Sequence, residues 1–128
     1  MKLDLDNLNP GTWFDFPDGE GRICLKTLSF DEAMEISKAT SKKKAEYKNN
    51  QRFAFDEIDE ERQTEMTWDK TILSWEGLYS KDKKEIPCTK EMKINLMRKS
   101  PEFARMVRGF LETLTAAETA QAEIEEKN

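Results

Sequence analysis

The stretch from Trp68 to Met92 constrains the fold most, because it combines an aromatic pattern of helical period with a strong stop signal. Trp68, Ile72 and Trp75 follow the i, i+4, i+7 spacing of one apolar helix face. Gly77 comes next, and a glycine after a helix readily takes the left-handed conformation that ends it. The pattern therefore predicts a helix over about residues 56–77 that stops at Gly77.

The second half of this stretch predicts a loop with a defined exit. Residues 80–84 are polar and charged, and Pro87 favours an extended conformation for the residue before it. Thr89 is a good N-cap for a following helix. We expect a helix–loop–helix unit whose two helices pack together.

The N-terminal part carries the pattern of a β-hairpin over residues 12–28. Residues 12–16 alternate towards a strand, residues 17–21 have the proline and glycine content of a turn, and residues 22–28 form a second apolar run. Because an isolated hairpin is marginally stable in water, this one must pack on helices or gain further strands.

Further helices are predicted over about residues 30–47, 89–99 and 101–115. Ser29 and Glu32 have the spacing of a capping box, and Ser100 before Pro101 is a clear helix start. Residues 49–51 are interpreted as a linker. Residues 116–128 are acidic and helix-prone but lack a packing face, so we expect this tail to fray.

Together these elements predict an α+β fold, mainly α, with an N-terminal β-hairpin packed on a bundle of about four helices. At 128 residues the chain is long enough for one globular domain, which we place at residues 1–115.

The composition argues against catalysis and metal binding. The chain has no histidine, which removes the commonest general base and metal ligand. It has no phosphate-binding loop, nucleophile elbow or Cys/His metal spacing. Cys24 and Cys88 are interpreted as buried thiols. We expect no enzyme activity, no metal and no cofactor. We also expect no nucleic-acid partner, because Lys42–Lys44 in a chain of net charge −5 is typical of a solvated helix end.

The last helix holds the strongest amphipathic signal and the candidate protein-binding face. Arg105 and Arg108 lie beside an apolar stripe at helical spacing, and the candidate residues of that stripe are Phe103, Val107, Phe110 and Leu114. Two interpretations stay open. The stripe is core and the arginines pair with Glu102 and Glu112, or the face binds another protein.

The order of motifs resembles the tail assembly chaperones of long-tailed, siphovirus-like phages and prophages. The closest similarity is Trp75-Glu76-Gly77-Leu78 followed, after a short loop, by Ile86-Pro87-Cys88-Thr89. The hairpin motif W-F-x-F-P-D-G and the S-P-E-F start of the last helix add to it. The similarity covers most of the chain, but residues 36–55 carry no motif of the family.

The resemblance implies a non-structural helper that binds the tape measure protein and then yields to the tail tube protein. It implies location in the cytoplasm of the bacterial host and absence from the mature virion. A homo-oligomer is compatible with it, and no membrane span is expected because the chain has no long apolar run. The alternatives are an acidic regulatory or inhibitory adaptor for a host protein, and a structural tail or head-completion subunit.

Overall fold

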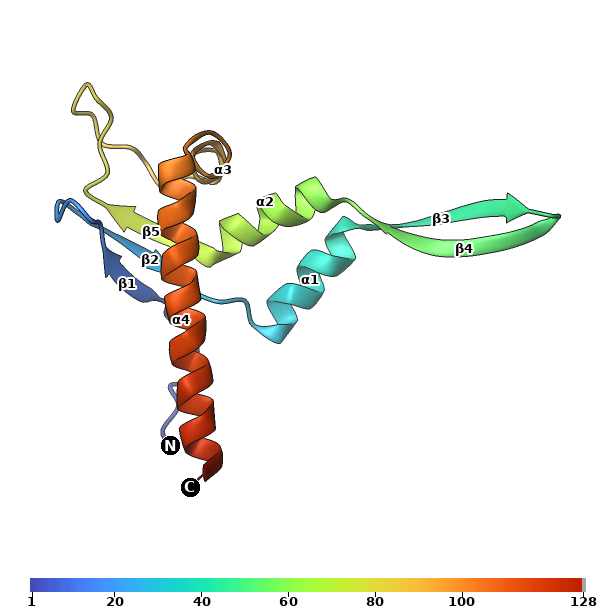
Figure 1. The fold of residues 1–128 in the computed structure, drawn as a ribbon, viewed down its shortest axis with the longest axis horizontal. Helices are drawn as coiled ribbons and strands as arrows, with labels where there is room; N and C mark the ends of the chain where they lie inside the picture. The colour runs from blue at the N-terminus through green and yellow to red at the C-terminus, as the bar shows by residue number, and fades with distance from the viewer. Residues whose placement is uncertain (128) are drawn as a thin grey trace.

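The computed structural model describes the backbone of residues 1–127 and the side chains of residues 1–124. Within this range the protein is α+β, with four helices and two small antiparallel sheets (Figure 1). The elements, in chain order, are β1 (Thr12–Asp15), β2 (Arg22–Leu25), α1 (Phe30–Thr40), β3 (Ser41–Lys48), β4 (Gln51–Ile58), α2 (Glu60–Thr71), β5 (Ile72–Glu76), α3 (Lys90–Lys99) and α4 (Pro101–Lys127).

A three-stranded sheet of order β1-β2-β5 forms the centre of the molecule. Strands β1 and β2 pair antiparallel from Thr12↔Leu25 to Asp15↔Arg22, and β5 adds to the other edge of β2. The third strand gives the hairpin the support that a two-stranded ribbon lacks in water.

The prediction of a helix over residues 56–77 is wrong at both ends, because the helix observed there is shorter. Helix α2 begins after Asp59, whose side chain accepts a hydrogen bond from the backbone N–H of Arg62, and it ends at Thr71. The chain then continues directly into β5, so Ile72 and Trp75 lie in a strand rather than on a helix with Trp68.

A β-bulge explains why these residues imitate helical spacing. Ile23 pairs with Trp75, but Leu25 pairs with Ile72, because the register shifts between Cys24 and Leu25. The extra residue in β5 brings Ile72 and Trp75, three positions apart, to the same buried face. A regular strand would have placed them on opposite faces.

Helices α3 and α4 cover this sheet, and α4 crosses it in the view of Figure 1. The common core is apolar and joins the sheet to both helices; it comprises Phe16, Ile23, Leu25, Ile72, Trp75, Met97, Phe103, Ala104 and Val107. Trp75 meets Phe103 edge-on with ring centroids 5.8 Å apart, and Phe14 stacks on Phe110 at 4.7 Å. The helices contact one another in chain order, so the sheet rather than a helix bundle organises the core.

The Trp75–Thr89 segment is held by specific backbone contacts. The indole N–H of Trp75 donates to the carbonyl of Ile86 at 2.8 Å, which anchors the loop before Pro87. Thr89 caps α3 as predicted, accepting a hydrogen bond from the backbone N–H of Met92 at 3.2 Å. The resemblance motifs therefore form the connection between β5 and α3.

Gly77 has the left-handed conformation expected of it, with φ of 70°, but it follows a strand and not a helix. A Cβ at Gly77 would lie 2.2 Å from the carbonyl oxygen of Glu20, and one at Gly21 would lie 2.2 Å from that of Glu76. The two glycines let the β1–β2 turn approach the end of β5 closely.

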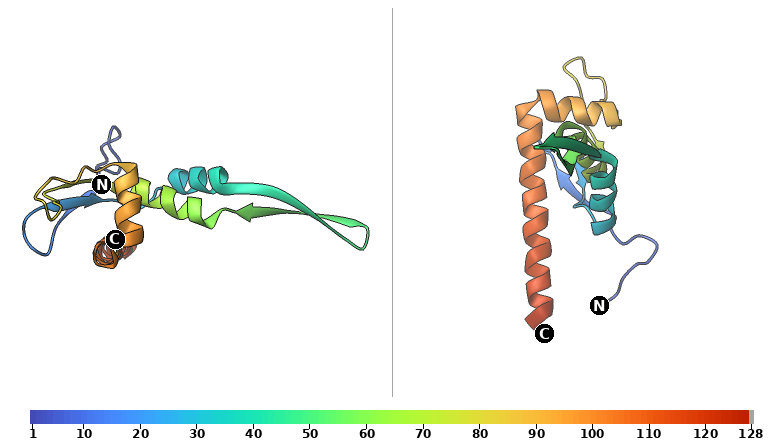
Figure 2. Two further views of the ribbon diagram at one scale, coloured as in Figure 1. Left: turned by 90° about the horizontal axis from the view of Figure 1, so that it is seen from above. Right: turned by 90° about the vertical axis from the view of Figure 1, so that its right-hand side faces the viewer.

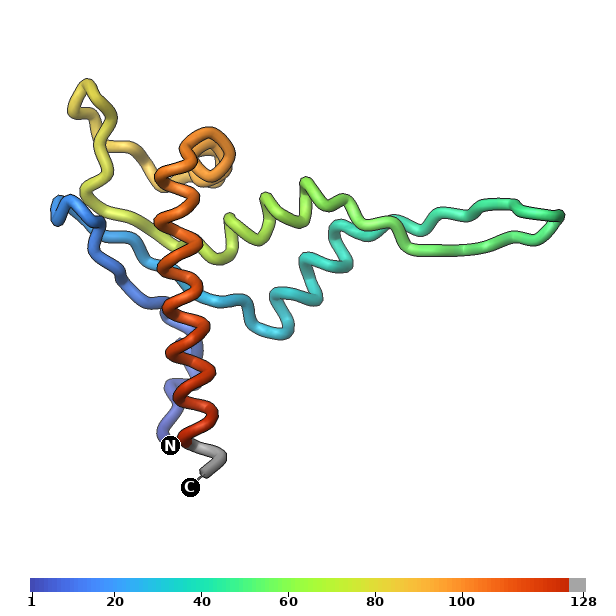
Figure 3. Tube along the Cα trace, in the orientation of Figure 1, coloured from blue at the N-terminus to red at the C-terminus, as the bar shows by residue number. Residues whose placement is uncertain are grey.

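The helix predicted over residues 30–47 stops at Thr40. Its start is as predicted, because Ser29 and Glu32 form a reciprocal capping box. From Ser41 the chain enters β3, turns at Asn49 and Asn50, and returns as β4. Figure 3 shows this hairpin, hereafter the arm (residues 41–58), extending away from the rest of the protein.

The interpretation of residues 49–51 as a linker is wrong for a local reason. Asn49 and Asn50 have φ of 51° and 65°, and Lys48 pairs with Gln51 across them. Positive φ at both central residues is the condition for a type I′ turn, which matches the twist of a hairpin, and asparagine tolerates it well.

Helices α3 and α4 begin where the sequence predicts. Ser100 accepts a hydrogen bond from the backbone N–H of Phe103, with Pro101 at the first helical position. Helix α4 does not stop near residue 115 but is described to Lys127, so residues 116–127 extend the helix. Its distal part contacts the body through Glu118, which accepts a hydrogen bond from the Thr27 hydroxyl at 3.0 Å.

Candidate functional site

The apolar stripe of α4 faces the sheet. Phe103 and Val107 are buried in the core, and Phe110 is partly buried against Phe14. Leu114 is partly buried. Phe103 and Val107 therefore hold α4 on the body and are not available as a surface, which favours the core interpretation of this stripe.

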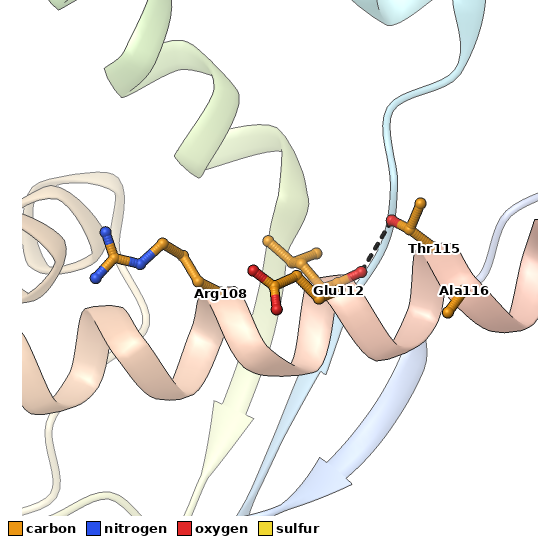
Figure 4. Close-up of a pocket in the computed structure, with 5 residues that line it drawn as sticks. Arg108, Glu112, Thr115 and Ala116 are labelled. Carbon is orange, nitrogen blue, oxygen red and sulfur yellow. Dashed lines mark hydrogen bonds between the residues drawn. The ribbon is translucent and has the colours of Figure 1, made fainter.

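The two arginines of the predicted binding face are exposed. Arg105 and Arg108 point into solvent from α4, and their role in binding a partner stays a prediction. Beside Arg108 the helix carries a shallow depression, shown in Figure 4 with Glu112, Thr115 and Ala116. Leu111 lines it too, and the Thr115 hydroxyl donates to the Leu111 carbonyl at 2.9 Å.

Trp68 belongs to the body and not to a binding surface. It is partly buried against the core, and the Arg98 guanidinium lies 6.0 Å from its ring centroid. Arg98 also contacts Glu61 at 2.9 Å and Glu65 at 2.7 Å. These contacts tie α3 to α2, so this group has a structural explanation.

The arm is the feature that the sequence interpretation missed. Its strands are eight residues each, and every residue except Ser41 is exposed. Figure 2 shows from a second direction that it stands clear of the body. Phe53 is 50% exposed, Phe55 41% and Tyr47 75%. Exposed aromatic side chains on a projecting ribbon are typical of a protein-binding surface.

The pairing register places the aromatic residues on two different faces. Phe53 and Phe55 are two residues apart in β4 and therefore share a face, together with their cross-strand partners Glu46 and Lys44. Tyr47 pairs with Arg52 on the opposite face. We call the first of these surfaces the Phe face; it comprises Lys42, Lys44, Glu46, Lys48, Gln51, Phe53, Phe55 and Glu57.

The lysines that were interpreted as a solvated helix end lie in the arm. Strand β3 contains four lysines and one glutamate, so it is a basic edge on an acidic protein. Near the base of the arm Lys44 forms an ion pair with Glu57. Towards the tip, Lys48 stands opposite the neutral Gln51.

The cysteines and the buried lysine of the body have structural and not catalytic surroundings. Burial raises the pKa of the Cys24 and Cys88 thiols, which lowers their thiolate content and hence their reactivity. Both cysteines are free thiols. Cys24 is buried as predicted, whereas Cys88 is only partly buried, so the prediction is wrong for Cys88. The ammonium group of the buried Lys93 reaches the carboxylate of Asp69 at 3.1 Å and its backbone carbonyl at 3.2 Å.

Among the residues with described side chains, no three His, Cys, Asp or Glu come together in a group that could hold a metal ion. None of the helices within residues 1–127 is long and apolar enough to cross a bilayer.

Comparison of the chain with models of protein families, with curated proteins and with solved structures finds no match. The candidate site therefore rests on the geometry of the arm and on the motifs of the sequence.

Proposed function

We propose that this protein is a tail assembly chaperone of a long-tailed phage or prophage. In this role it binds the tape measure protein and keeps it soluble in the cytoplasm of the bacterial host. It then gives way to the tail tube protein and is absent from the mature virion. It acts by binding and not by catalysis.

The observation that carries the proposal is the exposed arm. A chaperone for a long, apolar, helical protein needs apolar surface that stays accessible, and the Phe face supplies two aromatic side chains away from the core. The neighbouring lysines keep this surface soluble without covering it.

The family-like motifs support the proposal in a different way. Trp75, Gly77 and the Ile86–Thr89 segment build the junction between the sheet and α3. Their side chains serve the fold, so their resemblance to the family supports a similar body. The partner-binding surface is then sought outside them, on the arm.

Co-expression with the tape measure protein encoded in the same genome tests the function. The chaperone is tagged, and the pull-down is followed by light scattering of the eluted complex. We expect a soluble tape measure protein carrying several copies of the chaperone. The Phe53→Ser/Phe55→Ser variant is expected to recover much less tape measure protein, because truncating an aromatic residue at the centre of an interface, where hot spots lie, costs about 2 kcal/mol or more.

Tyr47→Ser is the matched control, because it removes an exposed aromatic ring from the opposite face of the same ribbon. An insoluble tape measure protein with the wild-type chaperone left alone in solution would contradict the proposed function. Equal loss with Tyr47→Ser would show that the Phe face is not the binding surface.

A further inference from the structure

Two exposed elements of this protein carry opposite charge. Strand β3 contributes four lysines against one glutamate. The distal part of α4, residues 112–124, contains Glu112, Glu118 and Glu123 and no basic residue. Residues 115–124 are exposed. Glu118 accepts a hydrogen bond from the Thr27 hydroxyl, so the acidic groups offered to a partner are Glu112 and Glu123.

These two elements point in different directions from the body. In Figure 1 the arm extends sideways from α1 and α2, whereas α4 runs down past the sheet towards the C-terminus. In the left view of Figure 2, from above, the arm again extends sideways and α4 is seen end-on. No ion pair joins the arm to α4 among the residues whose side chains are described. The basic arm of one molecule therefore does not neutralise the acidic segment of the same molecule.

The surfaces also match in their apolar content. On the Phe face, Phe53 lies opposite Glu46 and Phe55 lies opposite Lys44, which is paired with Glu57. Lys48, near the tip, has the neutral Gln51 opposite it and, among the described side chains of this face, supplies the unpaired positive charge nearest to Phe53. One face of α4 presents the depression beside Arg108, with Leu111 and Ala116 as its apolar part. Glu112 borders this depression, and Glu123 lies eleven residues further along, close to the same helical face.

We propose that the Phe face of one copy docks on the face of α4 from Arg108 to Glu123 in a second copy. The aromatic side chains cover Leu111 and Ala116, and the lysines of the arm face Glu112 and Glu123. When two copies exchange arms in this way, the same contact is made twice around a two-fold axis. The inference goes beyond the proposed function, because it concerns binding between copies of this protein. It uses the Phe face that the proposed function assigns to the tape measure protein, so a copy docked in this way must release its arm before that face can bind the tape measure protein.

The mass of the purified full-length protein is measured by light scattering and sedimentation at about 50 mM and about 500 mM salt, since exposed ion pairs are screened over this range. We expect a self-associated species at low salt and its weakening at high salt. Lys48→Glu and Glu112→Lys/Glu123→Lys should each raise the dissociation constant by about tenfold or more, as like charges then oppose each other.

Arg52→Glu is the matched control for Lys48→Glu. It makes the same charge change near the tip of the arm but on the opposite face, and it should leave self-association unchanged. Phe53→Ser and Tyr47→Ser form a second matched pair for the apolar part of the contact. All these positions are exposed, so circular dichroism of every variant should match that of the wild type.

Mixing the arm variant with the α4 variant separates the proposed contact from a general effect of net charge on association. The arm variant retains a native α4, and the α4 variant retains a native arm. An equimolar mixture therefore offers one native contact and one contact between the two surfaces of reversed charge, whose charges are again opposite in sign. We expect the mixture to form a heterodimer although each variant alone is largely monomeric. Combining both sets of substitutions in one chain should restore self-association, because the arm and α4 then again carry charges of opposite sign.

A monomeric wild type at low salt would overturn the inference, as would equal weakening by Arg52→Glu or a mixture that stays monomeric. The proposed function fails independently, in the absence of a soluble complex with the tape measure protein. A protein that self-associates but does not recover the tape measure protein would support the inference and contradict the proposed function. A protein that recovers the tape measure protein but stays monomeric would support the function and contradict the inference.

Discussion

The body and the arm of this protein are held together by different means. In the body, three strands and two helices bury a common apolar core in which Ile23, Leu25, Ile72 and Val107 are completely inaccessible. In the arm, the strands have no covering layer, and their order depends on the hydrogen-bonded ladder and the Asn49–Asn50 turn. A two-stranded ribbon of this kind contributes little stability of its own.

The difference separates residues that stabilise the fold from residues that are exposed and free to bind a partner. A long exposed ribbon with aromatic side chains is a liability for a soluble protein unless it meets a partner. Substitutions in the body should therefore change the free energy of unfolding, and substitutions in the arm should change association instead.

The largest expected effect comes from Trp75→Ala in the body. The substitution leaves a cavity beside Phe103 and removes the hydrogen bond to the Ile86 carbonyl. We expect a loss of about 3–5 kcal/mol in the free energy of unfolding, measured by urea titration. A loss this large also threatens folding at room temperature.

Trp13→Ala is the control for this prediction, since Trp13 is an exposed tryptophan of the neighbouring strand β1 that contacts Arg22. It should cost far less. If Trp75→Ala folded normally and lost only association, Trp75 would have to lie on a surface.

The next effect is expected at Gly77, where the turn of β1–β2 meets the end of β5. Gly77→Ala forces a side chain into the left-handed region and against the backbone oxygen of Glu20. The strain and the steric overlap together should cost about 2–4 kcal/mol. The measurement is the midpoint of thermal or urea unfolding.

Gly19→Ala separates the two causes. Gly19 has a similar φ of 76°, but an added Cβ would meet nothing within 4 Å. This variant should therefore lose only the conformational part, about 1 kcal/mol. Equal losses at both positions would show that the close approach at Gly77 is unimportant.

The sequence predicted those features that depend on neighbouring residues. The capping box at Ser29, the N-cap at Thr89 and the start of α4 at Ser100 are local patterns, and each is present. The sequence-based prediction failed where pairing with a strand far away in the sequence decides the structure. Ile72 and Trp75 have helical spacing, yet they pair with β2 because the central sheet needs a third strand.

The arm has a local signal in the sequence that favours a hairpin over a linker. Asn49-Asn50 followed by the alternation of Phe53 and Phe55 is the pattern of a tight turn and a strand. The lysines before it do not distinguish a helix end from a strand, because lysine is common in helices and also protects exposed edge strands. The amphipathic pattern therefore predicts a binding face on α4, where Phe103 and Val107 of the stripe are core, and the exposed aromatic residues lie in the arm.

A smaller effect, dependent on pH, is expected at the start of α1. The hydrogen bond from Lys26 and the capping contacts with Ser29 hold the pKa of Glu32 below its ordinary value of 4.5. A carboxyl whose pKa is lowered in the folded state stabilises the protein at pH values above its ordinary pKa. This contribution is lost as the pH falls through the pKa of the folded state. Glu32→Gln keeps a side chain suited to the capping box but removes the charge.

We therefore expect Glu32→Gln to cost about 1 kcal/mol at pH 7, and the difference from wild type to shrink at pH 3. Urea titrations at the two pH values measure it. Glu35→Gln is the control, because its contact with Lys70 is 3.7 Å long and exposed and should contribute little. A wild-type advantage that grew towards pH 3 would contradict the prediction.

The smallest effect on stability should come from removing most of the arm, which is the sharpest test of the comparison between the two regions. Replacing residues 43–56 by Asn-Gly leaves the base of the ribbon, including the hydrogen bond from the Asp59 N–H to the Thr40 carbonyl at 2.8 Å. Because the deleted residues are all exposed, the melting temperature should change by no more than about 3 °C. The truncated protein should at the same time lose self-association and recovery of the tape measure protein. A large fall in melting temperature would mean that the ribbon stabilises α1 and α2, and that the arm and the body form one cooperative unit rather than a stable scaffold with an attached binding surface.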